Sequence, residues 1–95
     1  MNLQDLHQQE KEVSALALFK GELGVATAIQ LNAQGKLKEH LTKSPALLLC
    51  VSGSVMYHDA NDLKVALAAG DYVLITPDVK HWLVASEVSQ LLLLK

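Results

Sequence analysis

Short apolar segments recur along the chain, and each one ends at residues that favour turns. Val, Ile, Leu and Ala fill the segments, while Gly, Asn, Asp and Ser stand between them and interrupt any long helix. This spacing predicts an all-β sandwich or barrel in one domain. Residues 1–12 are polar and without a period, so we expect a polar N-terminal segment ahead of a barrel over 13–95. The expected strands are 13–19, 25–31, 36–40, 46–51, 54–58, 63–68, 72–75, 81–86 and 90–94.

The chain is more apolar than a small β domain requires. Its 95 residues are 51% hydrophobic, slightly above the usual range. The surplus indicates either a leucine-rich core or apolar surface buried between subunits, and composition alone leaves both open. Residues 91–94 of the last expected strand are four leucines, so this strand is apolar on both of its faces. A strand of this kind is central or covered by another subunit, so we expect a homodimer.

Charge and cysteine content narrow the possible partners. The formal net charge is -2 and the chain contains no Arg, which argues against nucleic acid as a partner. Cys50 is the only cysteine, so no disulfide forms within the chain. The first twelve residues lack the apolar core of a signal peptide, and the apolar runs are too short to span a bilayer. We therefore expect a cytoplasmic protein with no membrane partner.

The residues that suggest chemistry stand at two places. One is the stretch 70–81, which joins Gly70, an apolar strand, the turn Thr76-Pro77-Asp78 and His81. The other is His40, which lies 13 residues before Gly53 and ahead of another apolar strand. Two imidazoles arriving from different strands could meet inside a small barrel and hold a metal.

These motifs resemble those of the cupin superfamily, in its small single-domain form. Over residues 70–81 the resemblance is good, with His81 at the histidine position and Asp78 where a glycine is usual. In the first motif His40 holds the first histidine position, but Thr42 replaces the second histidine and Ala46 replaces the glutamate. The resemblance implies a double-sheet β-barrel, or jelly roll, with its site in the lumen.

Strand alternation extends this prediction to the walls of the lumen. Side chains on a strand point to opposite faces in turn, so Leu48 and Cys50 should follow Ala46 inward. By the same argument Leu83 and Ala85 follow His81. The predicted ligand-binding lining is therefore mostly apolar with a few polar groups, as is usual for a small-molecule pocket. It comprises His40, Thr42, Ala46, Leu48, Cys50, His81 and either Tyr57 or Met56.

Three functions follow from this lining. The incomplete ligand set favours a small-molecule binding module over an enzyme. The alternative is a metal-dependent enzyme of oxygenase or isomerase type, in which His40 and His81, with Cys50 or water, hold Zn, Ni, Fe or Mn. The third is a structural or interaction homodimer with a packed lumen. Cys50 is expected to be a buried hydrophobe rather than a nucleophile, and His58 and Asp59 to be solvated turn residues.

Overall fold

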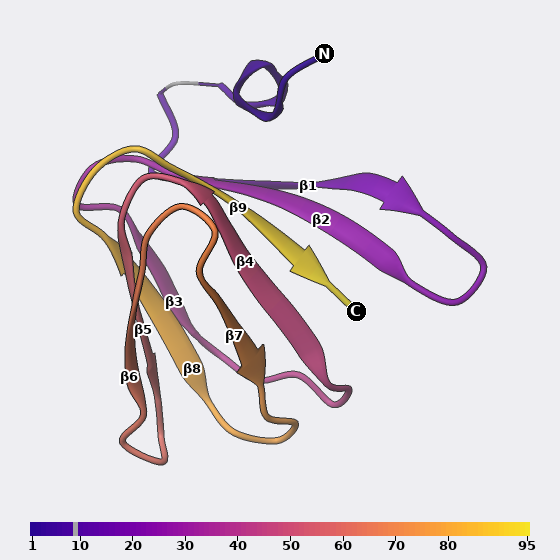
Figure 1. The fold of residues 1–95 in the computed structure, drawn as a ribbon, viewed down its shortest axis with the longest axis vertical. Coiled ribbons are helices and arrows are strands. Elements are labelled where there is room, and N and C mark those ends of the chain that lie inside the picture. The colour runs from indigo at the N-terminus through magenta and orange to yellow at the C-terminus, as the bar shows by residue number, and fades with distance from the viewer. Residues whose placement is uncertain (9) are drawn as a thin grey trace.

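The structure, a computed structural model, describes residues 1–8 and 10–95, and its regular secondary structure is almost entirely β-strand (Figure 1). Gln9, which belongs to the predicted polar segment, lies outside the described residues. A short 3-10 helix, η1 (Leu3–Leu6), precedes the strands. The strands are β1 (Val13–Lys20), β2 (Val25–Leu31), β3 (Lys36–His40), β4 (Ala46–Ser52), β5 (Val55–Asp59), β6 (Lys64–Leu67), β7 (Tyr72–Ile75), β8 (His81–Ala85) and β9 (Ser89–Leu94).

The strands form two antiparallel sheets. One has five strands in the order β1-β2-β9-β4-β7, and the other has four in the order β3-β8-β5-β6. Neighbours in these sheets are mostly distant in sequence, as in a jelly roll. In Figure 1 the β1–β2 hairpin extends to one side, beyond the strands with which it is paired. The predicted all-β double-sheet barrel is confirmed.

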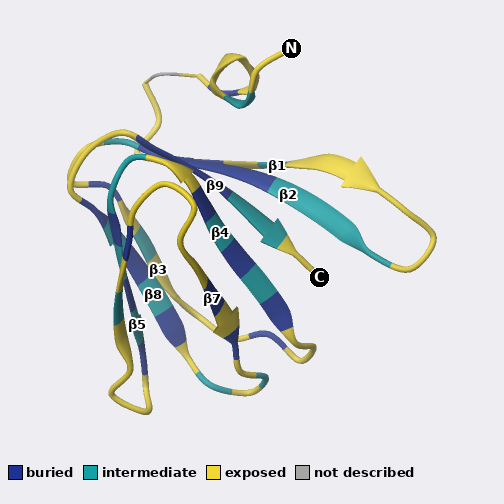
Figure 2. Cartoon of the chain, viewed as in Figure 1, coloured by how far each residue is buried: buried dark blue, intermediate teal, exposed yellow. Residues whose placement is uncertain are grey.

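Alternation of side chains across the strands builds the core between the two sheets. Along β4 the inward residues Ala46, Leu48 and Cys50 are buried, while Leu47 and Leu49 between them are only partly buried. Figure 2 shows this alternation along β4. On the four-stranded sheet, residues of β5 and β8 alternate in the same way. The predicted inward set Ala46, Leu48, Cys50, Tyr57, His81, Leu83 and Ala85 is buried throughout.

The turns depend on a few residues with left-handed backbone. Asp78 has φ of 64°, as expected for the residue that replaces a glycine in the β7–β8 turn. Its amide donates a hydrogen bond to the carbonyl of Thr42 at 2.8 Å, which ties this turn to the β3–β4 loop. Gly53 and Gly70 have φ of 94° and 90°, a region that favours glycine.

The N-terminal segment covers one end of the outer face of the five-stranded sheet. Ser14, Gln30 and Gln90 stand side by side on β1, β2 and β9. The Ser14 hydroxyl lies 2.7 Å from His7 Nδ1, and the Gln90 amide donates to Gln30 Oε1 at 2.7 Å. His7 is buried by this contact, so the segment packs on the sheet at its polar end.

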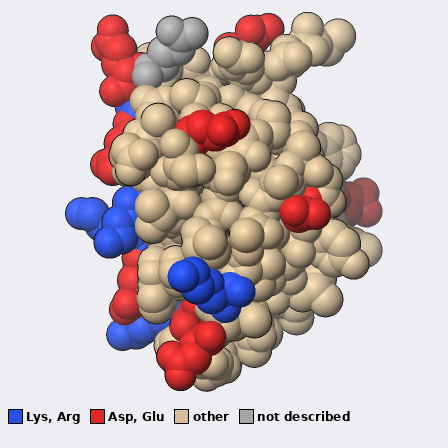
Figure 3. Space-filling view, turned by 60° about the vertical axis from the view of Figure 1, so that its left-hand side comes forward, with Lys and Arg blue, Asp and Glu red and all other residues tan. Residues whose placement is uncertain are grey.

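Charged side chains are unevenly distributed over the surface. On the face seen in Figure 3 they are sparse, and most lie along one margin and at the lower end. Within the described ranges, 1–8 and 10–95, no helix is both long and apolar enough to cross a bilayer. The cytoplasmic location stays a prediction.

Gly53 and Gly70 offer a matched test of the turn that follows β4. Both have left-handed backbone, so alanine at either position should cost about 1 kcal/mol in backbone strain. A Cβ at Gly53 would lie 2.6 Å from both Ser89 Cα and Val88 O, whereas a Cβ at Gly70 would meet nothing within 4 Å. In urea unfolding we therefore expect Gly53→Ala to lose about 3 kcal/mol or more and Gly70→Ala about 1 kcal/mol. Equal losses would contradict the close approach of the β8–β9 turn to Gly53.

Candidate functional site

The two predicted site histidines meet at the mouth of the barrel. Antiparallel pairing of β3 with β8 sets His40 opposite His81. Their Nε2 atoms are 3.1 Å apart, and their ring centroids are 4.1 Å apart at an angle of 62°. His81 is buried and His40 is exposed. The pair therefore joins the interior of the barrel to solvent.

The outer nitrogens of both rings face backbone carbonyls. His40 Nδ1 lies 3.3 Å from the Lys38 carbonyl oxygen, and His81 Nδ1 lies 3.4 Å from that of Val79. A carbonyl oxygen only accepts, so each Nδ1 is best satisfied as a donor. The two Nε2 lone pairs then converge, and a proton held between them makes an imidazole–imidazolium pair with a net positive charge.

The surroundings of His81 oppose that charge. Burial lowers the pKa of His81, and the neighbouring His40 lowers it further. Below it, the Tyr57 ring stacks on the imidazole at a centroid distance of 5.8 Å. Burial, with a smaller effect from Asp59, raises the pKa of Tyr57, so the phenol stays neutral. A charged His pair is therefore favourable only with a compensating negative group beside it.

Asp59 was expected among solvated turn residues, and that expectation is wrong. It is buried, and β5–β8 pairing sets it opposite His81. Its Oδ1 accepts hydrogen bonds from the backbone amides of Asn61 at 2.8 Å and Leu63 at 3.1 Å. The carboxylate thus holds the β5–β6 turn. Strand alternation could have predicted this burial, because Asp59 lies two residues after the inward-facing Tyr57.

His58 and Trp82 lie on the outer surface of the four-stranded sheet. Their rings stack with centroids 5.5 Å apart and an angle of 6° between planes. Trp82 is half-buried there and not in the core between the sheets. The expectation of a solvated His58 is corrected to a half-buried ring that packs on Trp82.

The lumen itself is nearly full. Next to the His pair lies a cavity of about 30 Å³, which is room for one or two water molecules. Tyr57 and Leu83 are almost completely buried and occupy much of the remaining interior. A whole small-molecule ligand therefore does not fit inside the barrel. The cavity is lined by Ile29, Leu37, His40, Leu48, Ile75, His81, Leu83 and Leu93.

Four predicted lumen residues do not line this cavity, namely Thr42, Ala46, Cys50 and Tyr57. The Thr42 hydroxyl donates to the Ser44 carbonyl at 3.0 Å, within the β3–β4 loop. Cys50 is fully buried, and its thiol contacts the Ser52 carbonyl at 3.5 Å. Burial and the nearby Asp71 raise the pKa of Cys50, which keeps the thiol protonated and unreactive. The Thr42 and Cys50 side chains therefore each bond to a backbone carbonyl two residues along the chain and do not face a ligand site.

The donor set does not fit a resident metal ion. The two Nε2 atoms could supply two ligands, but the other walls of the cavity are aliphatic. Among the residues that the structure describes, no group of three or more His, Cys, Asp or Glu side chains could hold a metal. Firm binding of a first-row metal usually needs three or four protein ligands.

An open groove leads to the His pair from outside. It has a volume of about 740 Å³ and shares Leu37 and His40 with the lumen cavity. No pattern in the sequence predicts this groove, although Lys36 and Lys38, which alternate with Leu37 just before His40, indicate a solvated, basic strand. The groove is lined by Lys11, Glu12, Val13, Lys36, Leu37, Lys38, Glu39 and His40.

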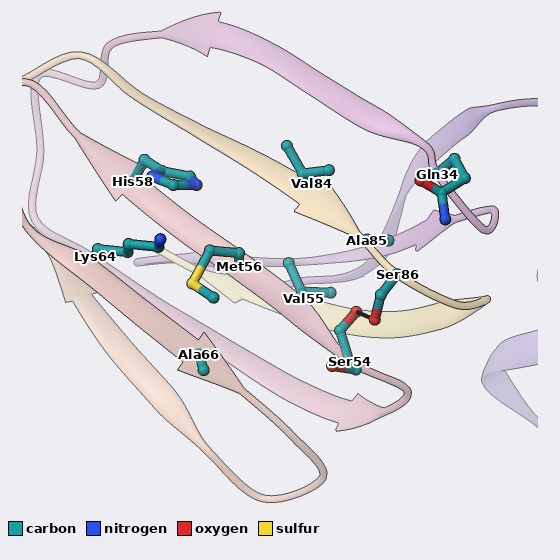
Figure 4. A pocket seen from close by; sticks show the side chains of 10 residues that line it. All are labelled: Gln34, Ser54, Val55, Met56, His58, Lys64, Ala66, Val84, Ala85 and Ser86. Carbon is teal, nitrogen blue, oxygen red and sulfur yellow. Dashed lines mark hydrogen bonds between the residues drawn. The ribbon is translucent and has the colours of Figure 1, made fainter.

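A second hollow, of about 360 Å³, lies on the outer face of the four-stranded sheet (Figure 4). Met56 and Val84 form its apolar middle, with Lys64 and His58 toward one end and Ser54 and Ser86 toward the other. Met56, the alternative to Tyr57 for the lumen, therefore points outward. This hollow is separate from the His pair, and Met56 is the one predicted lining residue that it contains.

Comparison with solved structures shows the cupin fold. A cupin superfamily protein from Desulfitobacterium hafniense has a TM-score of 0.85 at 15% identity, over 98% of this chain and 84% of that one. A double-stranded β-helix protein from Klebsiella pneumoniae has 0.84 at 16%, over 99% and 85%. A RmlC-like cupin from Shewanella frigidimarina has 0.79 at 18%, over 87% and 74%. No protein-family model and no curated protein matches the sequence. The likeness establishes a small cupin domain as the fold and leaves function to the site.

The lowered pKa of His81 predicts that acid destabilises the fold. Unfolded His81 binds its proton near pH 6.5, whereas folded His81 resists protonation until lower pH. Stability should therefore fall as the pH drops below about 6.5, and buried His7, whose pKa is also lowered, adds to the fall. Urea midpoints measured from pH 7.5 to 5 should decline less steeply for His81→Gln than for wild type. The matched control His58→Ala should keep the wild-type slope, and an unchanged slope in His81→Gln would contradict burial of a neutral imidazole.

The incomplete donor set predicts that the purified protein carries no stoichiometric metal. Elemental analysis after incubation with Zn, Ni, Fe or Mn and desalting should find well below one ion per chain, because two imidazoles hold such ions weakly. One ion per chain that disappears in His40→Ala/His81→Ala would overturn the prediction and restore the metal-enzyme interpretation.

Proposed function

We propose that this protein binds a small carboxylate-bearing molecule at the mouth of the barrel, without a metal. One observation carries the proposal: the Nε2 atoms of His40 and His81 converge at 3.1 Å where an open groove meets the lumen cavity. This keeps the binding role indicated by the sequence but moves the ligand from the lumen to the groove outside it.

Volume supports this division of the site. The groove is open to solvent and, at about 740 Å³, has room for the body of a small molecule, whereas the lumen cavity of about 30 Å³ admits only a few atoms. The ligand would insert one small polar group at the His pair and lay its remaining atoms along β3. Leu37, shared by groove and cavity, gives that part of the path an apolar wall.

The charged residues of the groove favour an anionic ligand. The groove contains three lysines, Lys11, Lys36 and Lys38, against two glutamates. Both carboxylates are engaged: Glu39 pairs with Lys80 at 3.4 Å, and Glu12 Oε1 accepts the Lys36 backbone amide at 3.3 Å. A carboxylate beside the protonated His pair would compensate, by charge attraction, the positive charge that burial otherwise disfavours.

The surroundings of the pair favour binding over catalysis. No nucleophile joins the histidines, because the Cys50 thiol bonds to the Ser52 carbonyl and Tyr57 is held neutral and buried. The nearest carboxylate by register, that of Asp59, is committed to backbone amides. The imidazoles are therefore placed to recognise a group rather than to transform it.

The test is NMR titration of the protein with acetate, succinate and benzoate at pH 6 and pH 8. We expect shifts of His40, His81 and Leu37 resonances, with tighter binding at pH 6 because the protonated pair attracts the anion. His40→Ala should weaken binding at least about tenfold, because it removes one half of the charged pair that attracts the anion.

The matched control is His58→Ala, which removes an imidazole from the opposite surface of the same sheet and should leave binding unchanged. Neutral amides of the same shape, such as acetamide, should bind more weakly than the acids. Equal binding of acids and amides, or shifts confined to the hollow around Met56, would refute the proposed site.

A further inference from the structure

The hollow on the outer face of the four-stranded sheet has a basic end, an apolar middle and a hydroxyl end (Figure 4). Strand register sets Lys64 opposite His58 at the basic end. One outward position along, Met56 lies between Ala66 and Val84. Paired residues point to the same side of a sheet, so the three regions follow one another along β5 in an order that the sheet fixes.

Small side chains make this surface concave. Ala66 contributes only a methyl group beside the longer Met56. Val55 and Ala85 also line the hollow although they are buried, so it reaches down to the backbone of β5 and β8. Its volume of about 360 Å³ corresponds to about a dozen non-hydrogen atoms, at the roughly 30 Å³ that a water molecule occupies in the liquid. The hollow therefore has room for the body of a small organic molecule.

The positive charge at the basic end is uncompensated. None of the described residues that line the hollow is Asp or Glu. Within residues 1–8 and 10–95 the Lys64 ammonium forms no ion pair. The His58 ring beside it is held in place by stacking on Trp82, at a centroid distance of 5.5 Å. An anionic group seated here would lie between an ammonium and an imidazole, both of which can donate hydrogen bonds to it.

The opposite end offers hydrogen-bonding groups without charge. The Ser86 amide and hydroxyl donate to the Ser54 carbonyl at 3.0 and 3.3 Å, which holds the start of the β8–β9 turn against β5. The Ser54 hydroxyl and the Gln34 side-chain amide line the same end and have no hydrogen-bond partner in the part of the chain that the structure describes. Ser54 and His58 are four residues apart, so about 13 Å of extended strand separates the two ends.

We propose that this hollow is a second binding site, which takes an elongated acid with an unbranched apolar body and a hydroxyl group at its far end. The carboxylate would lie at Lys64 and His58, the body over Met56 and Val84, and the hydroxyl group at Ser54. Covering the apolar middle removes apolar surface from water, whereas a ligand without charge would leave the ammonium unpaired. The site is separate from the His pair and does not depend on the function proposed for that pair.

The test is a titration of the wild-type protein with 8-hydroxyoctanoate, octanoate and 1,8-octanediol up to about 10 mM, a range that detects millimolar dissociation constants. Trp82, the only tryptophan of the chain, stacks on His58, so its fluorescence reports occupation of the basic end. NMR shifts of the Met56 and Val84 methyl groups report the apolar middle. We expect 8-hydroxyoctanoate to bind most tightly of the three, because only it matches all three regions.

Two variants with matched controls test the parts of the site. Ala66→Leu fills the middle of the hollow and should weaken binding of all three probes at least about tenfold, because its side chain occupies the space of the ligand. Lys64→Gln should weaken binding of the two acids about two- to fivefold and leave 1,8-octanediol unchanged, as expected for an exposed charge. Ala17→Leu and Lys20→Gln make the same changes at exposed positions of β1, in the other sheet, and should bind like wild type.

Three results would each overturn the proposal. They are the absence of saturable binding, equal binding to Ala66→Leu and wild type, and shifts of Leu37 and His40 in place of Met56 and Val84, which would put the probe in the groove. Because the hollow and the groove have separate reporter residues, failure of this proposal is distinguishable from failure of the function proposed for the His pair.

Discussion

The structure depends on one constraint, which is that each strand must bury one of its two faces between the sheets. In an extended chain, successive side chains point to opposite sides, so choosing the inward residues also fixes the outward ones. On β8 this places His81, Leu83 and Ala85 in the interior and Trp82 on the outer surface. The His pair and the apolar residues on the outer surface of the five-stranded sheet are both consequences of this single choice of register.

The same constraint places the two histidines of the pair in different environments. His81 is carried inward because it shares a face with Leu83, and the interior it enters is mostly aliphatic. His40 comes from an edge strand and stays exposed. One imidazole is therefore desolvated while its partner remains in water. The buried ring of His81 is satisfied on one side by the Val79 carbonyl and on the other by His40, and the proposed binding site is centred on this second contact.

Much of this arrangement could be predicted from sequence because the signal is local. Turn residues and apolar segments located the strands, and alternation identified Leu48, Cys50, Tyr57 and Leu83 as inward residues. The meeting of His40 with His81 followed from the resemblance to cupins. Alternation would also have placed Asp59 inside, but its position beside a turn suggested solvent instead.

The sequence could not predict the distances between side chains or the volume that they leave unfilled. Whether an inward residue lines a cavity depends on how far neighbouring side chains fill the space, as Tyr57 does beside His81. Cys50 faces the interior as predicted, yet its thiol is satisfied by a nearby carbonyl rather than by a histidine. The groove along β3 is lined by Lys11 and Lys38, which belong to segments far apart in the sequence. A local sequence pattern therefore could not predict it.

The leucine-rich strands β4 and β9 carry apolar side chains on both the inner and the outer surface of the five-stranded sheet. Leu48 and Leu93 point inward and line the lumen cavity, while Leu47, Leu49, Leu92 and Leu94 point outward. Strands that are apolar on both faces are usually buried on both, as in the middle layer of a three-layer domain. Here a 95-residue chain supplies only two layers. These outward leucines account for part of the 51% hydrophobic content of a domain whose lumen is already full.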